Sequence, residues 1–424
     1  MSVLAVNGGT PVRTTPFPRY NTIGAEEKQA AMEVLESGVL SQYLGTWSPD
    51  FYGGPRVRRL EREWAEYFGV KHAVSVNSAT SALNAAVGAA GVGPGDEVIV
   101  SPYTMTASAT AALVYGAIPV FADIDPDIFC ITPQSIRARI TPYTKAIIVV
   151  DLFGHPADID EIMQIAHEYN LTVIEDAAQA PGALYHNRFA GTLADIGVFS
   201  LNYHKTIHTG EGGILVTNDD YLADRLQLIR NHAEVVVKKK GVQNIVNMIG
   251  FNYRLPEIEA AIASEQLKKL ERLVIPRIKA ADHLTERLAL LPGITPPVVR
   301  AGVRHGYYVY AIRYDAVVTG LSRDRFVAAL NAEGIPMYSG YVEPIYLEPV
   351  YQQRIAFGKD GFPFTYPGYK GCVSYEPGIC PVTERMHYQG LFFTDICHAN
   401  ISLRDLDDTV TAFEKVLCHV AELS

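Results

Sequence analysis

The sequence predicts an α/β fold in which a mostly parallel, seven-stranded sheet lies between helices and is followed by a smaller α+β domain. Between about residues 55 and 235, short apolar runs alternate with stretches of helical periodicity, and Gly, Pro or Asp separate them. This alternation is typical of a sheet layered with helices. From Pro256 to about Leu290 the composition changes to a long helical pattern rich in Glu, Lys, Arg, Leu and Ala. We therefore expect a large domain over residues 1–265 and a small C-terminal domain over 266–424.

The expected sheet strands are mostly unbroken apolar runs, as in strands that are buried on both faces. They lie at 72–77, 96–101, 119–124, 145–153, 171–176, 196–201 and 212–218. Apolar positions with helical spacing occupy the intervals 81–90, 107–115, 159–169 and 221–231. In the small domain we expect a strand at 307–315, a helix at 322–334, a loop-rich region at 338–386 and a closing helix at 405–423.

Charge and hydropathy exclude several functions. The chain has 36 Lys and Arg against 46 Asp and Glu, a formal net charge of −10, so nucleic-acid binding is not expected. The longest apolar runs, such as 146–150, are far shorter than the ~20 residues of a membrane span. The N-terminus lacks the basic start and apolar stretch of a secretory signal. We expect a cytoplasmic protein that does not contact a membrane.

The five cysteines are widely spaced, without a CxxC pair. We interpret them as reduced thiols in the core or in loops. Cys372 and Cys380 lie eight residues apart in a segment rich in Gly, Pro and Tyr, and a metal site there is the weaker alternative. No metal is expected.

Four motifs follow expected strands, where open α/β sheets build their ligand sites. The first, NSATSAL (77–83), places small hydroxylic residues at the start of a helix. Free N–H groups and the helix dipole favour a phosphate at such a position, although a plain helix cap explains this motif equally well.

The second motif, VIEDAAQA (173–180), ends a buried strand with two carboxylates. A carboxylate that stays ionised there needs a cationic partner, and a pyridinium nitrogen beside Asp176 would be such a partner. Alternatively, the carboxylate caps the next helix.

The third motif, FSLNYHKTIHTGEGGILVTND (199–219), places Lys205 five residues after Ser200 in a glycine-rich loop. A lysine that acts as a Schiff-base nucleophile must lose its proton below its ordinary pKa of ~10.4, and burial at a sheet edge allows this. An isolated loop lysine is more often solvated, so the interpretation of Lys205 as a nucleophile depends on the neighbouring motifs.

The fourth motif, GFNYRLPEIEAAIASEQLKKLE (250–271), contains Asn252 and Arg254, which could bind an anion or hold the turn.

Taken together in this order and spacing, the motifs resemble the pyridoxal 5′-phosphate (PLP)-dependent sugar aminotransferases of the DegT/DnrJ/EryC1/StrS type, a branch of the aspartate aminotransferase fold (type I). The resemblance covers nearly the whole chain. Further segments that carry it are GPRVRRLEREWAEYFGVKHAVSVNSATSAL (54–83), GDEVIVSPYT (95–104), GAIPVFADID (116–125) and DLFGHPADID (151–160). Several motifs that match in series are far more specific than any one of them.

The resemblance implies a role for each matching residue. Lys205 would form the Schiff base with PLP and later move protons, Asp176 would pair with the pyridine nitrogen, and Gln179 would lie near the ring hydroxyl. Ser200 and the Ser78-Ala79-Thr80 turn would hold the phosphate. Asn252 would reach the phosphate of the neighbouring subunit, which implies a homodimer with shared active sites.

The chain departs from the family pattern at several positions. Ala79 replaces a glycine in the phosphate turn, but its N–H is still available. Met105 stands where relatives often place an aromatic ring against PLP, and a thioether can cover the ring less rigidly; Tyr103 is the alternative. The substrate loop 339–351 carries Gly340 where relatives have His, so substrate contacts cannot be transferred. The segments 42–54 and 355–380 could shape the acceptor pocket or be surface elaboration.

The implied reaction is a ping-pong transamination from L-glutamate or L-glutamine to a keto-sugar or keto-cyclitol in amino-sugar or antibiotic biosynthesis. Nucleotide-linked keto-sugars remain open as acceptors, and Arg300, Arg304 and 238–240 could contact a diphosphate, although solvated charges explain them more simply. Alternatives are a PLP-dependent dehydratase, an aromatic-amine synthase, or a regulator without turnover. The dehydratases replace the lysine with His. Here His204 only adjoins Lys205, which favours transamination.

Overall fold

The computed structural model describes residues 3–423. All the expected strands of the large sheet form, and they occur in the order β1-β9-β8-β5-β4-β2-β3. Their bounds are β1 His72–Val76, β2 Glu97–Val100, β3 Ile118–Phe121, β4 Thr144–Val150, β5 Thr172–Asp176, β8 Ile196–Ser200 and β9 Gly213–Thr217. Strand β9 runs antiparallel to its neighbours β1 and β8, and the other pairings are parallel. The prediction of a mostly parallel sheet is therefore confirmed.

Helices cover this sheet, because its strands are apolar on both faces and buried throughout. The helices of the large domain are α2 Pro55–Phe68, α3 Ala79–Ala89, α4 Ala107–Val114, α5 Pro133–Arg137, α6 Ile159–Tyr169, α7 Asp220–Arg230 and α8 Ala233–Lys240. A small sheet of order β11-β6-β7 lies beside them, with β6 at Leu184–Tyr185, β7 at Arg188–Phe189 and β11 at Val303–Arg304.

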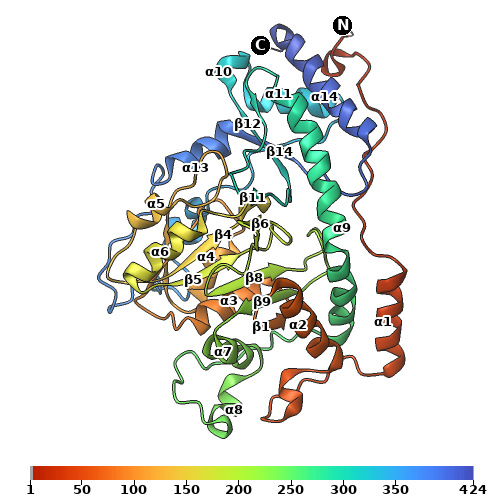
Figure 1. The fold of residues 1–424 in the computed structure, drawn as a ribbon. Coiled ribbons are helices and arrows are strands. Elements are labelled where there is room, and N and C mark those ends of the chain that lie inside the picture. Colours follow the sequence, from red (N-terminus) through yellow and green to blue (C-terminus); the bar gives the residue numbers. More distant parts are fainter. Residues whose placement is uncertain (1–2, 424) are drawn as a thin grey trace.

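The long helix α9 (Glu257–Leu288) connects the two parts of the chain (Figure 1). Its first half packs against α1 (Ala25–Ser37) and α2, and its second half reaches α14 (Leu403–Cys418). We propose residue 265, inside this helix, as the division between the domains, because the helix serves both cores.

The small domain contains a four-stranded antiparallel sheet of order β10-β12-β14-β13. Its strands are β10 Ile294–Thr295, β12 Tyr310–Tyr314, β13 Tyr338–Ser339 and β14 Leu391–Thr394. Helices α11 (Arg323–Ala332) and α14 pack on it, and the shorter helices are α10 Ala316–Thr319, α12 Pro349–Gln352 and α13 Pro381–Arg385. The N-terminal segment joins this domain, because Arg13 forms ion pairs with Asp405 and Asp408 at 2.6 and 3.0 Å.

Two expected strands are shorter than the sequence suggests. The strand expected at 145–153 ends at Val150, because residues 152–154 form a 3₁₀ turn in which Phe153 has φ +60°. The strand expected at 307–315 begins at Tyr310, because Tyr307 has φ +48° and the Tyr308 N–H donates to the carbonyl of Phe153. Both departures bring backbone from the two domains together.

The segment 355–380 packs over the outer edge of the large sheet. The Tyr375 hydroxyl donates to the carbonyl of Pro119 at 2.8 Å, and the Tyr369 hydroxyl donates to Glu97 at 2.5 Å. It thereby covers the edge next to β3, which would otherwise expose unpaired backbone groups. Within the described part of the chain, no helix is long and apolar enough to cross a membrane.

Candidate active site

A cavity of about 210 Å³ opens at the carboxyl ends of the parallel strands, where sheets of this class bind ligands. Eight of the nine residues that the sequence suggests for cofactor binding line it, namely Ser78, Ala79, Thr80, Met105, Asp176, Gln179, Ser200 and Lys205. These residues come from the first three motifs and from Met105, so the fold brings together what the sequence keeps apart. Asn252 does not line the cavity.

One end of the cavity is formed by the start of helix α3. Ser78 caps this helix, and its hydroxyl accepts a hydrogen bond from the Ser81 N–H at 3.0 Å. The N–H groups of Ala79 and Thr80, in the first turn, have no carbonyl partner within the helix. Gly213 explains the close approach of β9, because a Cβ atom there would lie 2.8 Å from the Ala79 nitrogen. The combination of exposed N–H groups and a helix dipole suits a phosphate.

Asp176 ends strand β5 and is buried beside the cavity. The Ser108 hydroxyl donates to its Oδ2 at 2.9 Å, and the Ala178 N–H donates to its Oδ1 at 3.2 Å. Burial raises the pKa of Asp176, while both hydrogen bonds and the charge of Lys205 oppose this increase. A cationic ligand group at this position would favour the ionised carboxylate.

Two further carboxyl groups are buried close behind Asp176. Asp151 follows β4, and Glu175 precedes Asp176 on β5. Burial, followed by the charge of Glu175, raises the pKa of Asp151, and burial also raises the pKa of Glu175. Asp151 Oδ2 and Glu175 Oε1 are buried without a donor among the described residues.

Lys205 lies in the loop after β8, where its N–H donates to the Asn202 carbonyl at 2.9 Å and closes a turn. Its side chain is buried, and this burial lowers its pKa to about 8, although Asp176 opposes the decrease. The Lys205 ammonium group lies 4.5 Å from the centre of the Tyr308 ring. No hydrogen bond or ion pair joins its Nζ to any of residues 3–423. The amine therefore faces the cavity and is available for reaction.

Gln179 has a fixed orientation at the cavity wall. Its Oε1 accepts a hydrogen bond from the Phe153 N–H at 2.8 Å, and its Nε2 donates to the Tyr341 hydroxyl at 2.9 Å. One amide hydrogen remains available for a ligand.

Of the two side chains considered for covering the cofactor ring, only Met105 lines the cavity, and 60% of it is exposed. Tyr103 is completely buried and contacts the rings of Tyr341 and His387 instead. The structure therefore favours Met105 over Tyr103 for covering the ring, because the Tyr103 side chain packs behind the cavity wall.

The fourth motif holds a turn close to the helix that begins at Ala79. The Tyr253 carbonyl accepts a hydrogen bond from the Asn77 N–H at 2.9 Å, while the Asn252 side chain is exposed. Arg254 donates to Asn231 Oδ1 from Nε and Nη2, at 3.0 and 2.7 Å. Of the two interpretations of Arg254, the structure favours the one in which it holds the turn.

Sequence reasoning missed several residues of the cavity wall, three of which carry hydroxyl groups close to the predicted site residues. Ser108 lies in a helix of small residues whose pattern gives no sign of a polar role. Tyr308 and Tyr341 come from the small domain and reach the cavity only through tertiary packing. The nearest signal was the pair of adjacent tyrosines at 307–308, which precedes an expected strand.

The cysteines and other potential ligand residues form no metal centre. All five cysteines are free, with Cys130, Cys380 and Cys397 buried. Among residues 3–423, no group of three or more His, Cys, Asp or Glu side chains could hold a metal ion.

Comparison with known proteins is consistent with this arrangement. Residues 21–386 match the sequence model of the DegT/DnrJ/EryC1/StrS aminotransferase family. The chain is 34% identical over 438 residues to the L-glutamine:2-deoxy-scyllo-inosose aminotransferase of Streptoalloteichus tenebrarius, and this match covers 99% of each chain. It is 39% identical over 301 residues to the GDP-perosamine synthase of Caulobacter vibrioides, with 70% of this chain and 79% of that protein covered.

The fold also matches solved structures. The crystal structure of an aminotransferase from Psychrobacter cryohalolentis superposes with a TM-score of 0.81 at 30% identity, and the match covers 96% of this chain and all of the other.

Proposed function

The chain belongs to the DegT/DnrJ/EryC1/StrS aminotransferase family, and from this premise we propose that it transfers an amino group from L-glutamine or L-glutamate to a keto-sugar or keto-cyclitol. It is a PLP-dependent aminotransferase of fold type I. The observation that carries the proposal is the single cavity in which Lys205, Asp176, Ser200 and the start of α3 meet.

The residues present fit PLP. A buried amine with a lowered pKa (Lys205) suits the aldehyde, and a buried carboxylate (Asp176) suits the pyridinium nitrogen. At the other end, the Ser200 hydroxyl and the N–H groups of Ala79 and Thr80 suit the phosphate. Gln179 would lie by the ring hydroxyl, and Met105 would cover one face of the ring. Bound PLP supplies an electrophilic carbon and a ring that accepts the electrons released when a Cα proton is removed.

Lys205 carries the proton transfers in this proposal. Its Nζ would hold the cofactor, and the free amine would take the proton from the donor Cα. The same Nζ later delivers a proton when the acceptor has entered. A pKa of about 8 suits both tasks, because general acid–base groups work best when their pKa lies near the operating pH.

Asp176 would keep the ring nitrogen of bound PLP protonated, and its own position is fixed by Ser108 and Ala178. Because the carboxylate is held before the reaction begins, little reorganisation is needed when charge develops in the ring. Gln179 is fixed in the same way, because it accepts a hydrogen bond from the Phe153 N–H and donates one to the Tyr341 hydroxyl.

A homodimer with shared active sites is part of the proposal. The Asn252 side chain is exposed and does not line the cavity of its own chain, so it is available to a second copy. Nearby, Ile245 and Ile249 are 66% and 70% exposed, and apolar side chains exposed together are typical of interfaces. Sedimentation should give the mass of two chains of 46.5 kDa each, and a monomer would contradict the shared site.

Two relatives support the acceptor class by what their names state, a scyllo-inosose in one case and a perosamine product in the other. A role in amino-sugar or antibiotic biosynthesis follows from the same comparison.

We also propose a cytoplasmic location, because the five cysteines are free thiols, as is usual in reducing compartments.

The test compares Lys205→Ala with Lys145→Ala, which removes an exposed lysine from β4. Amino transfer from L-glutamine to 2-deoxy-scyllo-inosose and to a nucleotide-linked 4-keto-sugar is measured by detecting the aminated product. Lys205→Ala should lose at least about 10³-fold in rate, given the usual size of proton-transfer contributions, and Lys145→Ala should retain its activity. Wild-type turnover of Lys205→Ala would refute the proposed role.

A further inference from the structure

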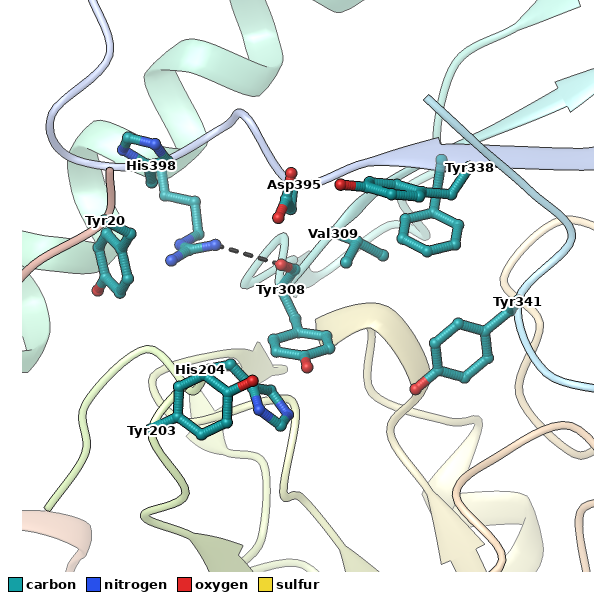
Figure 2. A pocket seen from close by; sticks show the side chains of 11 residues that line it. Tyr20, Tyr203, His204, Tyr308, Val309, Tyr338, Tyr341, Asp395 and His398 are labelled. Atoms are coloured by element: carbon teal, nitrogen blue, oxygen red, sulfur yellow. Dashed lines mark hydrogen bonds between the residues drawn. The ribbon is translucent and has the colours of Figure 1, made fainter. Parts of the chain in front are cut away.

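Figure 2 shows the residues that line a second cavity, of about 410 Å³, which adjoins the cofactor cavity. His204, Tyr308 and Tyr341 line both cavities. A molecule whose reacting group lies at Lys205 can therefore extend past Tyr308 into the second cavity. In Figure 2, Tyr308 lies between His204 and Asp395.

The second cavity contains one cationic side chain, Arg277 from α9. Its Nη1 donates to the carbonyls of Tyr307 and Tyr308 at 3.1 and 3.3 Å, and its buried Nε has no acceptor among the described residues. No carboxylate within residues 3–423 forms an ion pair with it. Arg277 can therefore hold one ligand carboxylate.

Asp395, which follows β14, supplies the carboxylate of the same cavity. It is exposed, and no hydrogen bond or ion pair joins its side chain to the rest of the described chain. Its charge acts on the tyrosines of the cavity. Burial and then the charge of Asp395 raise the pKa of Tyr338, and Asp395 adds a smaller increase to the pKa of Tyr308, after burial and Tyr341 and against the opposing effect of Arg277. Apart from Arg277, the other polar side chains that line the cavity are tyrosine hydroxyls and histidine imidazoles, and none of them forms an ion pair with Asp395.

The basic residues considered for a diphosphate are engaged elsewhere. Arg300 pairs with Asp125 at 2.8 Å, and Arg304 pairs with Glu271 at 2.6 Å. Neither arginine lines either cavity, nor does the lysine cluster at 238–240. A ligand with several negative charges would thus meet one arginine and, close by, one unpaired carboxylate.

We propose that Asp395 determines specificity by disfavouring substrates that place a negative charge in this cavity. The inference rests on the proposed aminotransferase function. Arg277 takes the α-carboxylate of the amino donor, and Asp395 faces the end of the donor side chain. The side-chain amide of L-glutamine can donate a hydrogen bond to Asp395, whereas the second carboxylate of L-glutamate is repelled by it. The same repulsion favours an uncharged keto-cyclitol over a diphosphate-linked sugar.

The experiment measures the donor half-reaction of the PLP-loaded enzyme by absorbance, with L-glutamine and L-glutamate, in wild type and Asp395→Asn. Asp395→Ser serves as a second variant. The wild type should favour L-glutamine in kcat/KM, and Asp395→Asn should reduce this preference by about five- to tenfold, the scale of one charge interaction at a partly exposed site. Most of the change should come from faster reaction with L-glutamate. Asp360→Asn, which alters an exposed aspartate outside both cavities, should leave the ratio unchanged.

The other outcomes overturn the inference in distinguishable ways. An unchanged ratio, or an equal loss with both donors, would mean that Asp395 does not discriminate between them. A wild-type preference for L-glutamate would reverse the inferred selectivity. If the wild type binds PLP and converts neither donor, the proposed function itself fails and this inference fails with it. Salt should reduce the wild-type preference, because it screens exposed charges.

Discussion

The side-chain nitrogen of Gln179 donates to the hydroxyl of Tyr341 at a distance of 2.9 Å. Gln179 follows β5 of the large domain, and Tyr341 follows β13 in the small domain. The bond therefore links the two domains at the wall of the cofactor cavity.

Replacing Tyr341 with Phe removes this acceptor and leaves an amide hydrogen of Gln179 unpaired. An unsatisfied buried donor costs about 1–2 kcal/mol, so PLP affinity should fall by about five- to thirtyfold. Titration of the cofactor-free protein with PLP measures this change. Tyr369→Phe loses a comparable hydroxyl contact with Glu97 far from the cavity and should bind PLP as the wild type does. Equal affinity of both variants would show that Gln179 does not depend on Tyr341.

The rate of PLP attachment should depend on pH through Lys205. Only the neutral amine attacks the aldehyde, and burial lowers the Lys205 pKa from 10.5 to about 8. The attachment rate should therefore rise with pH to a midpoint near 8, with about a tenth of the amine neutral at pH 7. Stopped-flow absorbance on the cofactor-free protein measures the midpoint, and Nα-acetyl-lysine serves as the solvated reference. A midpoint above about 10 would mean that Lys205 is not desolvated.

Asp176→Asn should preserve the shape of the site and remove its charge. The Ala178 N–H can still donate to the amide oxygen, but the ring nitrogen loses its anionic partner. Transamination should fall by about 10²–10³-fold, the usual cost of losing one preorganised electrostatic contact. The control is Asp195→Asn, which alters a carboxylate that accepts from the Val173 N–H at the opposite end of β5. Near-normal turnover by Asp176→Asn would exclude the ring-nitrogen role.

Much of this architecture could be predicted from local patterns. All the strands of the large sheet were identified because most of them are continuous apolar runs. Lys205, Asp176 and Ser200 were proposed because the motifs that contain them, in this order and spacing, resemble those of a known family. The ends of β4 and the start of β12 were misplaced, because left-handed residues at Phe153 and Tyr307 interrupt runs that remain apolar in composition.

The rest of the site depends on distant contacts. Ser108 reaches Asp176 across 68 positions of sequence, and Tyr341 reaches Gln179 across 162. No local pattern encodes such pairs, because neither partner differs from an ordinary core or loop residue until the sheet has formed. The same holds for Arg277 and Asp395, which meet in one cavity from α9 and from the loop after β14.

A stability prediction concerns the contact between α1 and α9. Glu27 is buried and accepts a hydrogen bond from Lys269 at 2.5 Å, and Gln266 and the Gly24 N–H also donate to it. Burial alone would raise the Glu27 pKa, but these donors outweigh it and hold the pKa below its ordinary value. Glu27→Gln leaves Lys269 partly uncompensated and should lower the free energy of unfolding by about 3–5 kcal/mol at pH 7.

The pH dependence of this effect follows from the direction of the shift. A carboxyl with a lowered folded-state pKa stabilises the protein above its unfolded pKa of 4.5, and the contribution disappears as the pH falls through the folded value. The difference between wild type and Glu27→Gln in urea unfolding should therefore shrink below about pH 4.5. Glu26→Gln, which alters the exposed partner of the same lysine, should have only a small effect. A constant difference down to acid pH would show that the charge of Glu27 does not stabilise the fold.

The central claim is tested most directly by the visible absorption spectrum of the PLP-loaded protein before and after addition of L-glutamine and, separately, of L-glutamate. We expect a band of lysine-bound PLP that converts to the band of pyridoxamine phosphate, faster with L-glutamine. A protein that forms no such band, or whose band converts with neither donor, would contradict the assignment of Lys205 and the proposed amino transfer.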